Sequence, residues 1–197
     1  MDSTYLLSGA PPPTLKRNAD IAGPDFYPTP SWATLALTEV EKFAGSIWEP
    51  ACGDGSMSEA LKSRGYEVIS TDLYDRGYGQ ANIDFTASQR QAENIITNPP
   101  YHSAQKFAEQ GVKLAKHKCA LLLRLAFLEG SHRANTIFNE APPSRIWVFS
   151  ERITFYPKGA ERKGNGTTAY AWFVWDSDGS DQTQLGWIPP GLKKRFG

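Results

Sequence analysis

An apolar run at residues 95–97 leads directly into the sequence Asn98-Pro99-Pro100-Tyr101. Two consecutive prolines donate no backbone hydrogen bonds and each fixes its own φ, while Pro99 also keeps Asn98 out of the helical region. A buried strand is therefore expected to end in a rigid elbow. The elbow presents a carboxamide, backbone carbonyls and an aromatic ring, which suit a flat group bearing an amino group. A proline-rich turn with a core tyrosine explains the same residues equally well.

Strand and helix patterns alternate along the chain, which favours an α/β fold with a doubly wound sheet. Helices are expected after Pro30, after the glycine loop at residues 53–55, and over residues 103–116 and 131–139. Strands are expected at residues 46–48, 67–71, 82–85, 94–97, 119–125, 145–149 and 169–175. The 197 residues suffice for one domain with a substantial core.

Composition sets the expected domain boundaries. Residues 1–24 are rich in proline, glycine, alanine and serine, and are expected to form an extended arm. The domain is expected over residues 25–180, followed by an exposed tail at residues 181–197. Within the domain, residues 151–168 carry several glycines and cations and predict a loop or hairpin on the substrate side.

Composition also argues against several classes of protein. The formal net charge is zero, so the total charge does not announce a nucleic-acid partner. The two cysteines and three histidines lack zinc spacing, so no metal site is expected. No apolar stretch is long enough to span a membrane, and the first residues lack the basic region of a signal peptide. A cytoplasmic protein in a reducing compartment is therefore expected.

Polar residues follow several expected strands at their carboxyl ends, where open α/β sheets bind ligands. The loop at Gly53 and Gly55 lacks the third glycine of a dinucleotide fingerprint and is not a P-loop, so it suits a nucleoside without phosphate. Asp72 lies about where an acid that accepts ribose hydroxyls belongs. Asp84 and Phe85 offer an acceptor and a ring for adenine. S-adenosylmethionine combines these features, although any single acid is more often an ordinary solvated carboxylate.

Three segments resemble the motifs of one enzyme family. Residues 49–55, Glu-Pro-Ala-Cys-Gly-Asp-Gly, look like motif I of the N6-adenine DNA methyltransferases, and the elbow looks like their motif IV. Residues 25–30, Asp-Phe-Tyr-Pro-Thr-Pro, resemble motif X. The order X, I, IV matches the gamma subgroup, and the resemblance covers about residues 25–175. It implies a Rossmann-like class I methyltransferase domain with a seven-stranded, mostly parallel sheet, an antiparallel last strand and helices on both faces.

The resemblance also implies which residues bind S-adenosylmethionine. Asp72 would accept the ribose hydroxyls, and the segment before the first helix would hold the methionine end. The full expected set is Tyr27, Pro28 and Thr29 at the methionine end, Asp84 and Phe85 at the adenine, and Glu49, Ala51, Gly53, Gly55, Asp72, Leu73 and Asn98.

At the elbow, the resemblance implies direct methyl transfer to the N6 amino group of adenine in DNA. The Asn98 side-chain oxygen and the Pro99 carbonyl would accept both N6–H bonds and favour a more nucleophilic nitrogen. The expected catalytic residues are Asn98, Pro99, Pro100 and Tyr101. The base must leave the duplex, and Tyr101 and Phe155 would stack on it. The sulfonium supplies the methyl group, so no metal is needed, and S-adenosylhomocysteine is the product.

Members of this family usually carry a separate target-recognition domain, and none is expected here, because only about 20 residues follow the last predicted strand. DNA contacts are then expected from the arm, the tail and the loop at residues 151–168, where Lys158, Arg162 and Lys163 would track phosphates. Simple solvation of a charged loop explains these residues as well. The compact arrangement resembles phage or prophage adenine methylases, and a monomer or weak dimer is expected.

Three other functions fit parts of the sequence. A protein methyltransferase acting on a glutamine amide needs the same carboxamide geometry at Asn98, but that group usually has an N-terminal helical domain and a different motif I. An RNA adenine methyltransferase is compatible with the neutral charge. A module that binds S-adenosylmethionine or nucleic acid without turnover is the non-enzymatic alternative, and the complete elbow argues against it.

Overall fold

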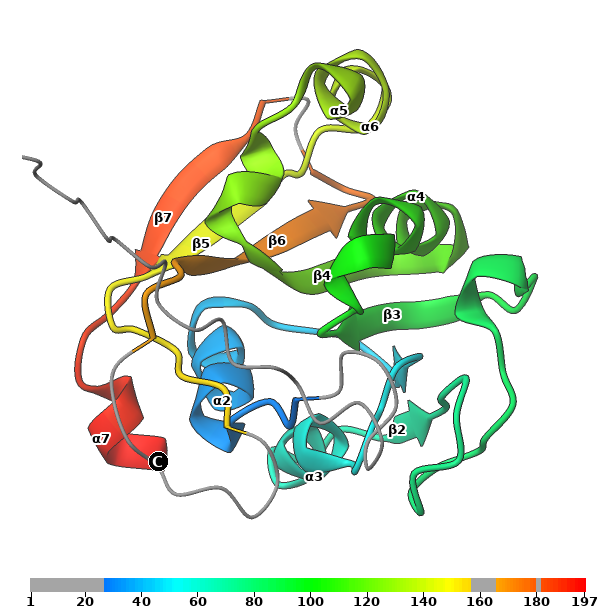
Figure 1. Cartoon of the computed structure of the whole chain (residues 1–197), viewed down its shortest axis with the longest axis vertical. Coiled ribbons are helices and arrows are strands. Elements are labelled where there is room, and N and C mark those ends of the chain that lie inside the picture. Colours follow the sequence, from blue (N-terminus) through cyan, green and yellow to red (C-terminus); the bar gives the residue numbers. More distant parts are fainter. Residues whose placement is uncertain (1–26, 157–165, 180–181) are drawn as a thin grey trace, which may run out of the picture.

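The computed structural model describes residues 27–156, 166–179 and 182–197. Their strands are β1 (Ile47–Glu49), β2 (Val68–Ser70), β3 (Ala92–Thr97), β4 (Ala115–Arg124), β5 (Arg145–Phe149), β6 (Tyr170–Asp176) and β7 (Gln184–Ile188). They form one seven-stranded sheet in the order β2-β1-β3-β4-β6-β5-β7 (Figure 1). β6 runs antiparallel to its neighbours β4 and β5, and the other neighbouring strands pair in parallel.

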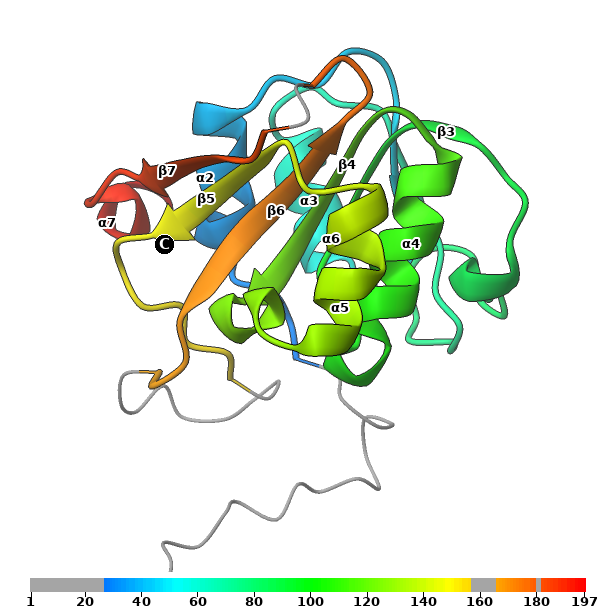
Figure 2. The same ribbon diagram turned by 90° about the horizontal axis from the view of Figure 1, so that it is seen from above.

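Helices cover both faces of the sheet (Figure 2). One layer contains α2 (Ser31–Val40), α3 (Ser56–Lys62) and α7 (Leu192–Phe196), and the other contains α4 (Ala104–Leu114), α5 (Ser131–Asn135) and α6 (Ile137–Glu140). Short 3-10 helices are η1 (Phe85–Ala87), η2 (Tyr101–Ser103) and η3 (Leu125–Leu128). The arrangement confirms the predicted doubly wound, mostly parallel α/β fold.

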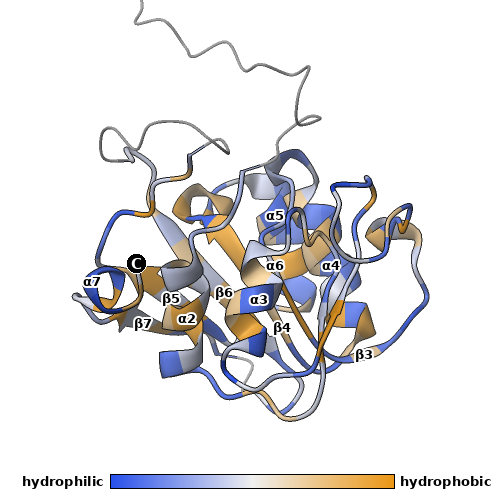
Figure 3. Cartoon of the chain, turned by 90° about the horizontal axis from the view of Figure 1, so that it is seen from below, coloured by the Kyte–Doolittle hydropathy of each residue, from blue (hydrophilic) through white to orange (hydrophobic). Residues whose placement is uncertain are grey.

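The core is divided into two layers by side-chain alternation along the central strands. Ile95 and Leu121 belong to the layer beneath α4, whereas Ile96 and Leu122 belong to the layer beneath α2 and α3. Because both faces of the sheet are covered, successive positions in β3 and β4 are apolar. Figure 3 shows this pattern as hydrophobic colour along β4 and β6, with hydrophilic residues on the outer sides of the helices.

The strand predicted at residues 82–85 is absent, so this prediction is wrong. Asp84 instead caps η1, because its carboxylate accepts hydrogen bonds from Thr86 N at 2.8 Å and Thr86 Oγ1 at 2.7 Å. Such a local bond offers the backbone an alternative to a strand. At this edge of the sheet β2 is followed only by a parallel bridge between Thr71 and Gln80 among the described residues.

The C-terminal residues belong to the sheet, and the tail predicted for residues 181–197 is wrong. β7 pairs in parallel with β5, from Gln184 opposite Arg145 to Ile188 opposite Phe149. Ile188 and Leu192 are buried, and α7 packs against α2. The antiparallel strand expected to be the last is therefore followed by one more strand. The arm predicted at residues 1–24 lies outside the described residues.

Glu41, which directly follows α2, ties this helix to β4, β5 and β6. Its carboxylate accepts hydrogen bonds from Arg145, from Trp147 Nε1 at 2.8 Å and from Lys118 Nζ at 2.9 Å. Arg145 and Lys118 also pair with Asp176. Burial by itself would raise the pKa of Glu41, but these hydrogen bonds outweigh burial and leave the pKa below its ordinary value. The folded protein therefore keeps this buried carboxylate charged and paired.

Replacing Glu41→Gln should lower the free energy of unfolding by about 3 kcal/mol, because two cations lose their shared carboxylate. Glu39→Gln, in α2, removes exposed ion pairs with Arg64 and Arg195 and should cost less than about 1 kcal/mol. The Glu41 contribution is fully present above the unfolded pKa of about 4.5 and fades as the pH falls through the lower folded pKa. Urea unfolding at neutral and acidic pH measures both effects, and equal losses in the two variants would contradict the network.

Candidate active site

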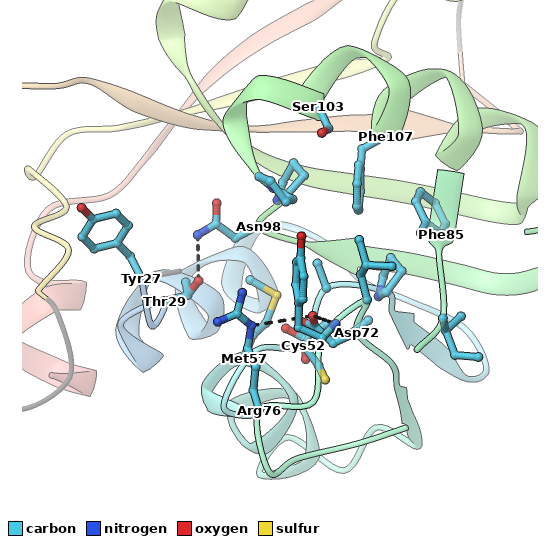
Figure 4. Close-up of a pocket in the computed structure, with 18 of the residues that line it drawn as sticks. Tyr27, Thr29, Cys52, Met57, Asp72, Arg76, Phe85, Asn98, Ser103 and Phe107 are labelled. Carbon is cyan, nitrogen blue, oxygen red and sulfur yellow. Dashed lines mark hydrogen bonds and ion pairs between the residues drawn. The ribbon is translucent and has the colours of Figure 1, made fainter. Parts of the chain in front are cut away.

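A pocket opens at the carboxyl ends of β1, β2 and β3. In the sheet, β1 lies between β2 and β3, so the chain moves to opposite sides of β1 in successive crossovers. Open α/β sheets bind ligands at such a switch point. The cavity measures about 330 Å³. Its walls include Tyr27, Pro28, Thr29, Glu49, Ala51, Cys52, Met57, Asp72, Leu73, Arg76, Asp84, Phe85, Phe107 and residues 98–103 (Figure 4).

Two glycines with positive φ shape the loop after β1. Gly53 has φ 57° and Gly55 has φ 85°, in the left-handed region that favours glycine. A Cβ on Gly55 would lie 2.5 Å from the Tyr78 ring, so this glycine also permits close packing. Cys52, Asp54 and Ser56 line the pocket, whereas the two glycines do not. The two predicted glycines therefore determine the backbone conformation of the loop and do not line the pocket.

Asp72 joins the loops that follow β1 and β2. Its Oδ2 accepts a hydrogen bond from Gly53 N at 2.8 Å, and its Oδ1 accepts one from Tyr74 N at 2.9 Å. The Arg76 Nε lies 3.7 Å from the same Oδ1. A carboxylate offers about four lone-pair sites, so acceptor capacity remains for a ligand hydroxyl.

Glu49, the last residue of β1, places a buried acid in the pocket wall. Only 2% of the residue is exposed. Ser58 Oγ donates a hydrogen bond to its carboxyl group and lies 2.6 Å from Ser70 Oγ. Burial raises the pKa of Glu49 to about 8 against the opposing effect of the Ser58 hydrogen bond, and nearby carboxylates add to the rise. Glu49 is therefore mainly protonated at neutral pH.

Aromatic rings form the side of the pocket farthest from Tyr27 (Figure 4). The buried Phe85 ring has its centroid 4.8 Å from that of Phe107 and 5.2 Å from that of Trp48. Asp84, beside it in sequence, lines the pocket but is exposed to solvent. Phe107 lies in α4 and also lines the pocket, and helical spacing in the sequence does not distinguish a core ring from a pocket ring.

The elbow directly follows β3, and Asn98 lies in the pocket wall. Its Nδ2 donates a hydrogen bond to Thr29 Oγ1 at 3.0 Å (Figure 4). Its Oδ1 is buried and has no hydrogen-bond partner among the described residues. An unsatisfied buried acceptor costs about 1–3 kcal/mol. The folded chain therefore holds a pocket-lining oxygen whose cost a ligand N–H would relieve.

Tyr101 begins η2 and packs among other aromatic side chains. Its ring centroid lies 6.0 Å from that of Tyr170, which lies 5.0 Å from that of Phe155. Burial raises the pKa of the Tyr101 hydroxyl, and the adjacent Tyr170 hydroxyl raises it further. The Arg124 guanidinium covers the Tyr101 ring at 4.5 Å from the centroid. Nothing in the sequence spacing indicated that Tyr170 joins the two predicted stacking rings.

The pocket brings together most of the residues predicted to bind a cofactor. They are Tyr27, Pro28, Thr29, Glu49, Ala51, Asp72, Leu73, Asp84, Phe85 and Asn98. The sequence did not single out Met57 or Arg76, although Met57 lies in the first turn after the glycine loop, which was a usable signal. The predicted phosphate contacts Lys158, Arg162 and Lys163 lie outside the described residues.

Neither a metal cluster nor a membrane-spanning helix is found in the described parts of the chain. No three His, Cys, Asp or Glu side chains gather there as ligands of an ion would. None of the helices described is both long and apolar enough to cross a bilayer.

Three solved structures resemble this fold. A protein from Listeria monocytogenes, named as a class I S-adenosylmethionine-dependent methyltransferase, aligns with a TM-score of 0.54 and 16% identity over 83% of this chain and 66% of its own. The methyltransferase subunit of a type I restriction-modification system from Streptococcus thermophilus aligns with a TM-score of 0.59 and 13% identity, over 85% of this chain and 48% of its own. A protein from Pyrococcus horikoshii, named as an RNA methyltransferase, aligns with a TM-score of 0.58 and 15% identity, over 77% of this chain and 87% of its own.

These similarities establish the fold, which is that of class I S-adenosylmethionine-dependent methyltransferases. The chain spans about two thirds of the Listeria protein and about half of the restriction-modification subunit. No protein-family model and no curated protein sequence matches the chain.

Glu49→Gln should gain stability relative to the wild type as the pH rises from about 5 to about 8. The folded protein keeps the Glu49 proton up to a pKa of about 8, whereas the unfolded carboxyl ionises near 4.5. Wild-type stability therefore falls across this window, by about 1.4 kcal/mol per pH unit at most, and the amide variant lacks this loss. Urea unfolding along the pH series measures the difference. A difference that stays constant with pH would contradict a buried, neutral Glu49.

Proposed function

We propose that the protein transfers a methyl group from S-adenosylmethionine to the N6 amino group of an adenine flipped out of DNA. The observation that carries the proposal is the buried, unpaired Oδ1 of Asn98 in the wall of the switch-point pocket. Beside it, Pro99 contributes a backbone carbonyl within the same rigid elbow. Two acceptors on one elbow fit an amino group with two N–H donors.

The pocket fits S-adenosylmethionine in size and in chemistry. Its volume of about 330 Å³ lies within the range of small-molecule sites. Asp72 and Asp84 supply carboxylates for ribose hydroxyls and the adenine amine, and Phe85 and Phe107 supply apolar surface. Carboxylates at this position attract the sulfonium and ammonium charges of the cofactor and disfavour a phosphate. The segment at residues 27–29 would hold its methionine end, as the resemblance implies.

Asn98 would prepare the adenine amine for attack. The N6 lone pair is delocalised into the ring, which makes the amine a poor nucleophile. Hydrogen bonds from both N6–H groups to Asn98 Oδ1 and the Pro99 carbonyl favour a tetrahedral nitrogen and stabilise the positive charge that grows on it. Because Asn98 Nδ2 donates to Thr29, the amide oxygen is left for the substrate. S-adenosylmethionine supplies an activated methyl group when bound.

Base capture would depend on the aromatic rings beside the elbow. Extruding a base costs a few kcal/mol, and stacking on an aromatic side chain returns about 1–3 kcal/mol. Tyr101 and Phe155 both pack against Tyr170, so the two rings belong to one aromatic cluster at the elbow. Phosphate contacts would come from the loop residues Lys158, Arg162 and Lys163.

The same carboxamide geometry would serve an adenine in RNA or a glutamine amide. The order of the segments that resemble motifs X, I and IV supports adenine in DNA. A restriction-modification subunit and a protein named as an RNA methyltransferase are both among the similar structures, so the fold is compatible with either nucleic acid.

Asn98→Ala should lower kcat for methyl transfer to DNA by about 10²–10³-fold, as loss of one preorganised hydrogen-bonding group does. The affinity for S-adenosylmethionine should stay within a few-fold, because the carboxylates and rings of the pocket remain. Steady-state kinetics and calorimetric titration measure the two quantities. Thr29→Val should reduce kcat about tenfold through loss of the amide anchor, whereas Thr29→Ser should retain activity. Full activity in Asn98→Ala would contradict the proposed role of Asn98 in binding the N6 amino group.

Tyr101→Ala should raise KM for DNA and lower kcat, because the stacking ring is lost, whereas Tyr101→Phe should keep most of the activity. The phenylalanine variant should nevertheless lower the free energy of unfolding by about 1 kcal/mol, since the hydroxyl is buried beside Tyr170. Kinetics at saturating S-adenosylmethionine, together with urea unfolding, separate the two effects. Equal loss of activity in both variants would refute stacking.

A further inference from the structure

Arg124 places an exposed positive charge beside the elbow. It is the last residue of β4, a strand that lies between β3 and β6 in the sheet (Figure 1). In the pairing of β4 with β6, Arg124 lies opposite Tyr170. Its guanidinium carbon lies 4.5 Å from the centroid of the Tyr101 ring. The residue is exposed to solvent, whereas the ring beneath it is only partly so. An accessible cation therefore covers the ring proposed to receive the flipped base.

The hold on Arg124 is weak. Within the described residues the Arg124 guanidinium forms no ion pair, and it makes one cation–π contact, with the Tyr101 ring. A cation–π contact at an exposed site is worth about 0.5–1 kcal/mol. Several other arginines are held more firmly: carboxylates pair with Arg64, Arg76, Arg145 and Arg195, and backbone carbonyls accept from Arg133. Arg90 resembles Arg124 in that its guanidinium lies over a ring, that of Trp48 at 5.6 Å.

A flipped base would compete with Arg124 for the Tyr101 ring. Stacking of a base on an aromatic side chain is worth about 1–3 kcal/mol, more than the exposed cation–π contact that it would replace. The displaced guanidinium would then lie next to the backbone of the flipped nucleotide. Phosphate is the group there that a guanidinium fork binds best, through two parallel hydrogen bonds.

We propose that Arg124 covers the base-stacking face of Tyr101 in the free protein and moves to a DNA phosphate when the flipped adenine takes its place. The inference rests on the proposed function and adds a positioning residue that binds the DNA backbone. The exchange links base capture to phosphate binding, because Arg124 leaves the Tyr101 ring for a phosphate when the flipped adenine stacks on that ring.

Salt dependence of DNA binding tests the phosphate contact. The Kd for a duplex that the wild type methylates is measured by fluorescence anisotropy between about 50 and 200 mM salt, with S-adenosylhomocysteine present. Each phosphate contact makes the slope of log K against log salt more negative by about 0.9, so Arg124→Ala should make the slope shallower by about 1. Arg124→Lys keeps the charge and should keep the slope.

A matched control is Arg64→Ala. The Arg64 guanidinium also covers a ring, that of Phe196 at 4.8 Å, but Glu39 holds it at 2.8 Å. Its slope and affinity should equal those of the wild type. A 2-aminopurine at the target position reports base capture: in Arg124→Ala the saturating fluorescence should match the wild type, because Tyr101 remains, while half-saturation needs about tenfold more protein at low salt.

The outcomes separate this inference from the function beneath it. If the wild type methylates adenine in DNA but Arg124→Ala keeps the wild-type slope and affinity, the role of Arg124 is overturned and the proposed function stands. A purely structural role for Arg124 would lower stability without changing the slope, which also overturns the inference. If the wild type transfers no methyl group to DNA adenine, both proposals fail.

Discussion

Parallel pairing of β1 with β2 on one side and β3 on the other is the constraint on which the site depends. It brings the loops that begin at Pro50, Thr71 and Asn98 to one edge of the sheet, although they are far apart in sequence. A few hydrogen bonds then fix these loops to each other and to the N-terminal segment. Asp72 accepts from Gly53, and Asn98 donates to Thr29. The pocket therefore follows first from topology and second from side-chain chemistry.

Buried polar groups are paired with donors and cations at one end of the sheet and are left neutral or unpaired at the other. Near the amino ends of β4 and β5, Glu41 is surrounded by donors and cations that compensate its burial. At the carboxyl ends of β1 and β3, Glu49 keeps its proton and Asn98 keeps an unpaired oxygen. Unsatisfied acceptors cost free energy in the folded protein, and ligand binding would recover it. The stable network away from the pocket offsets that cost within the same domain.

The sequence predicted those parts whose chemistry is local. Two prolines make an elbow at residues 98–101 almost regardless of context, and the spacing from Gly55 to Asp72 placed an acid at the next strand end. One failure has a local cause, and the others depend on distant segments. The segment at residues 82–85 forms no strand because Asp84 bonds to Thr86 and caps η1, which begins at Phe85, whereas β7 becomes a strand only against β5. The cluster around Tyr101 depends on the pairing of β4 with β6, which no local pattern reveals.

We propose that the elbow presents the amino group of an adenine in DNA to a methyl donor. The most direct test is incubation of the protein with S-adenosylmethionine carrying an isotopic label in its methyl group. DNA, RNA and protein are supplied in parallel and then analysed as nucleosides or peptides by mass spectrometry. We expect labelled N6-methyladenine in DNA. Label found only in RNA, methylated glutamine in protein, or no transfer to any of the three would contradict it.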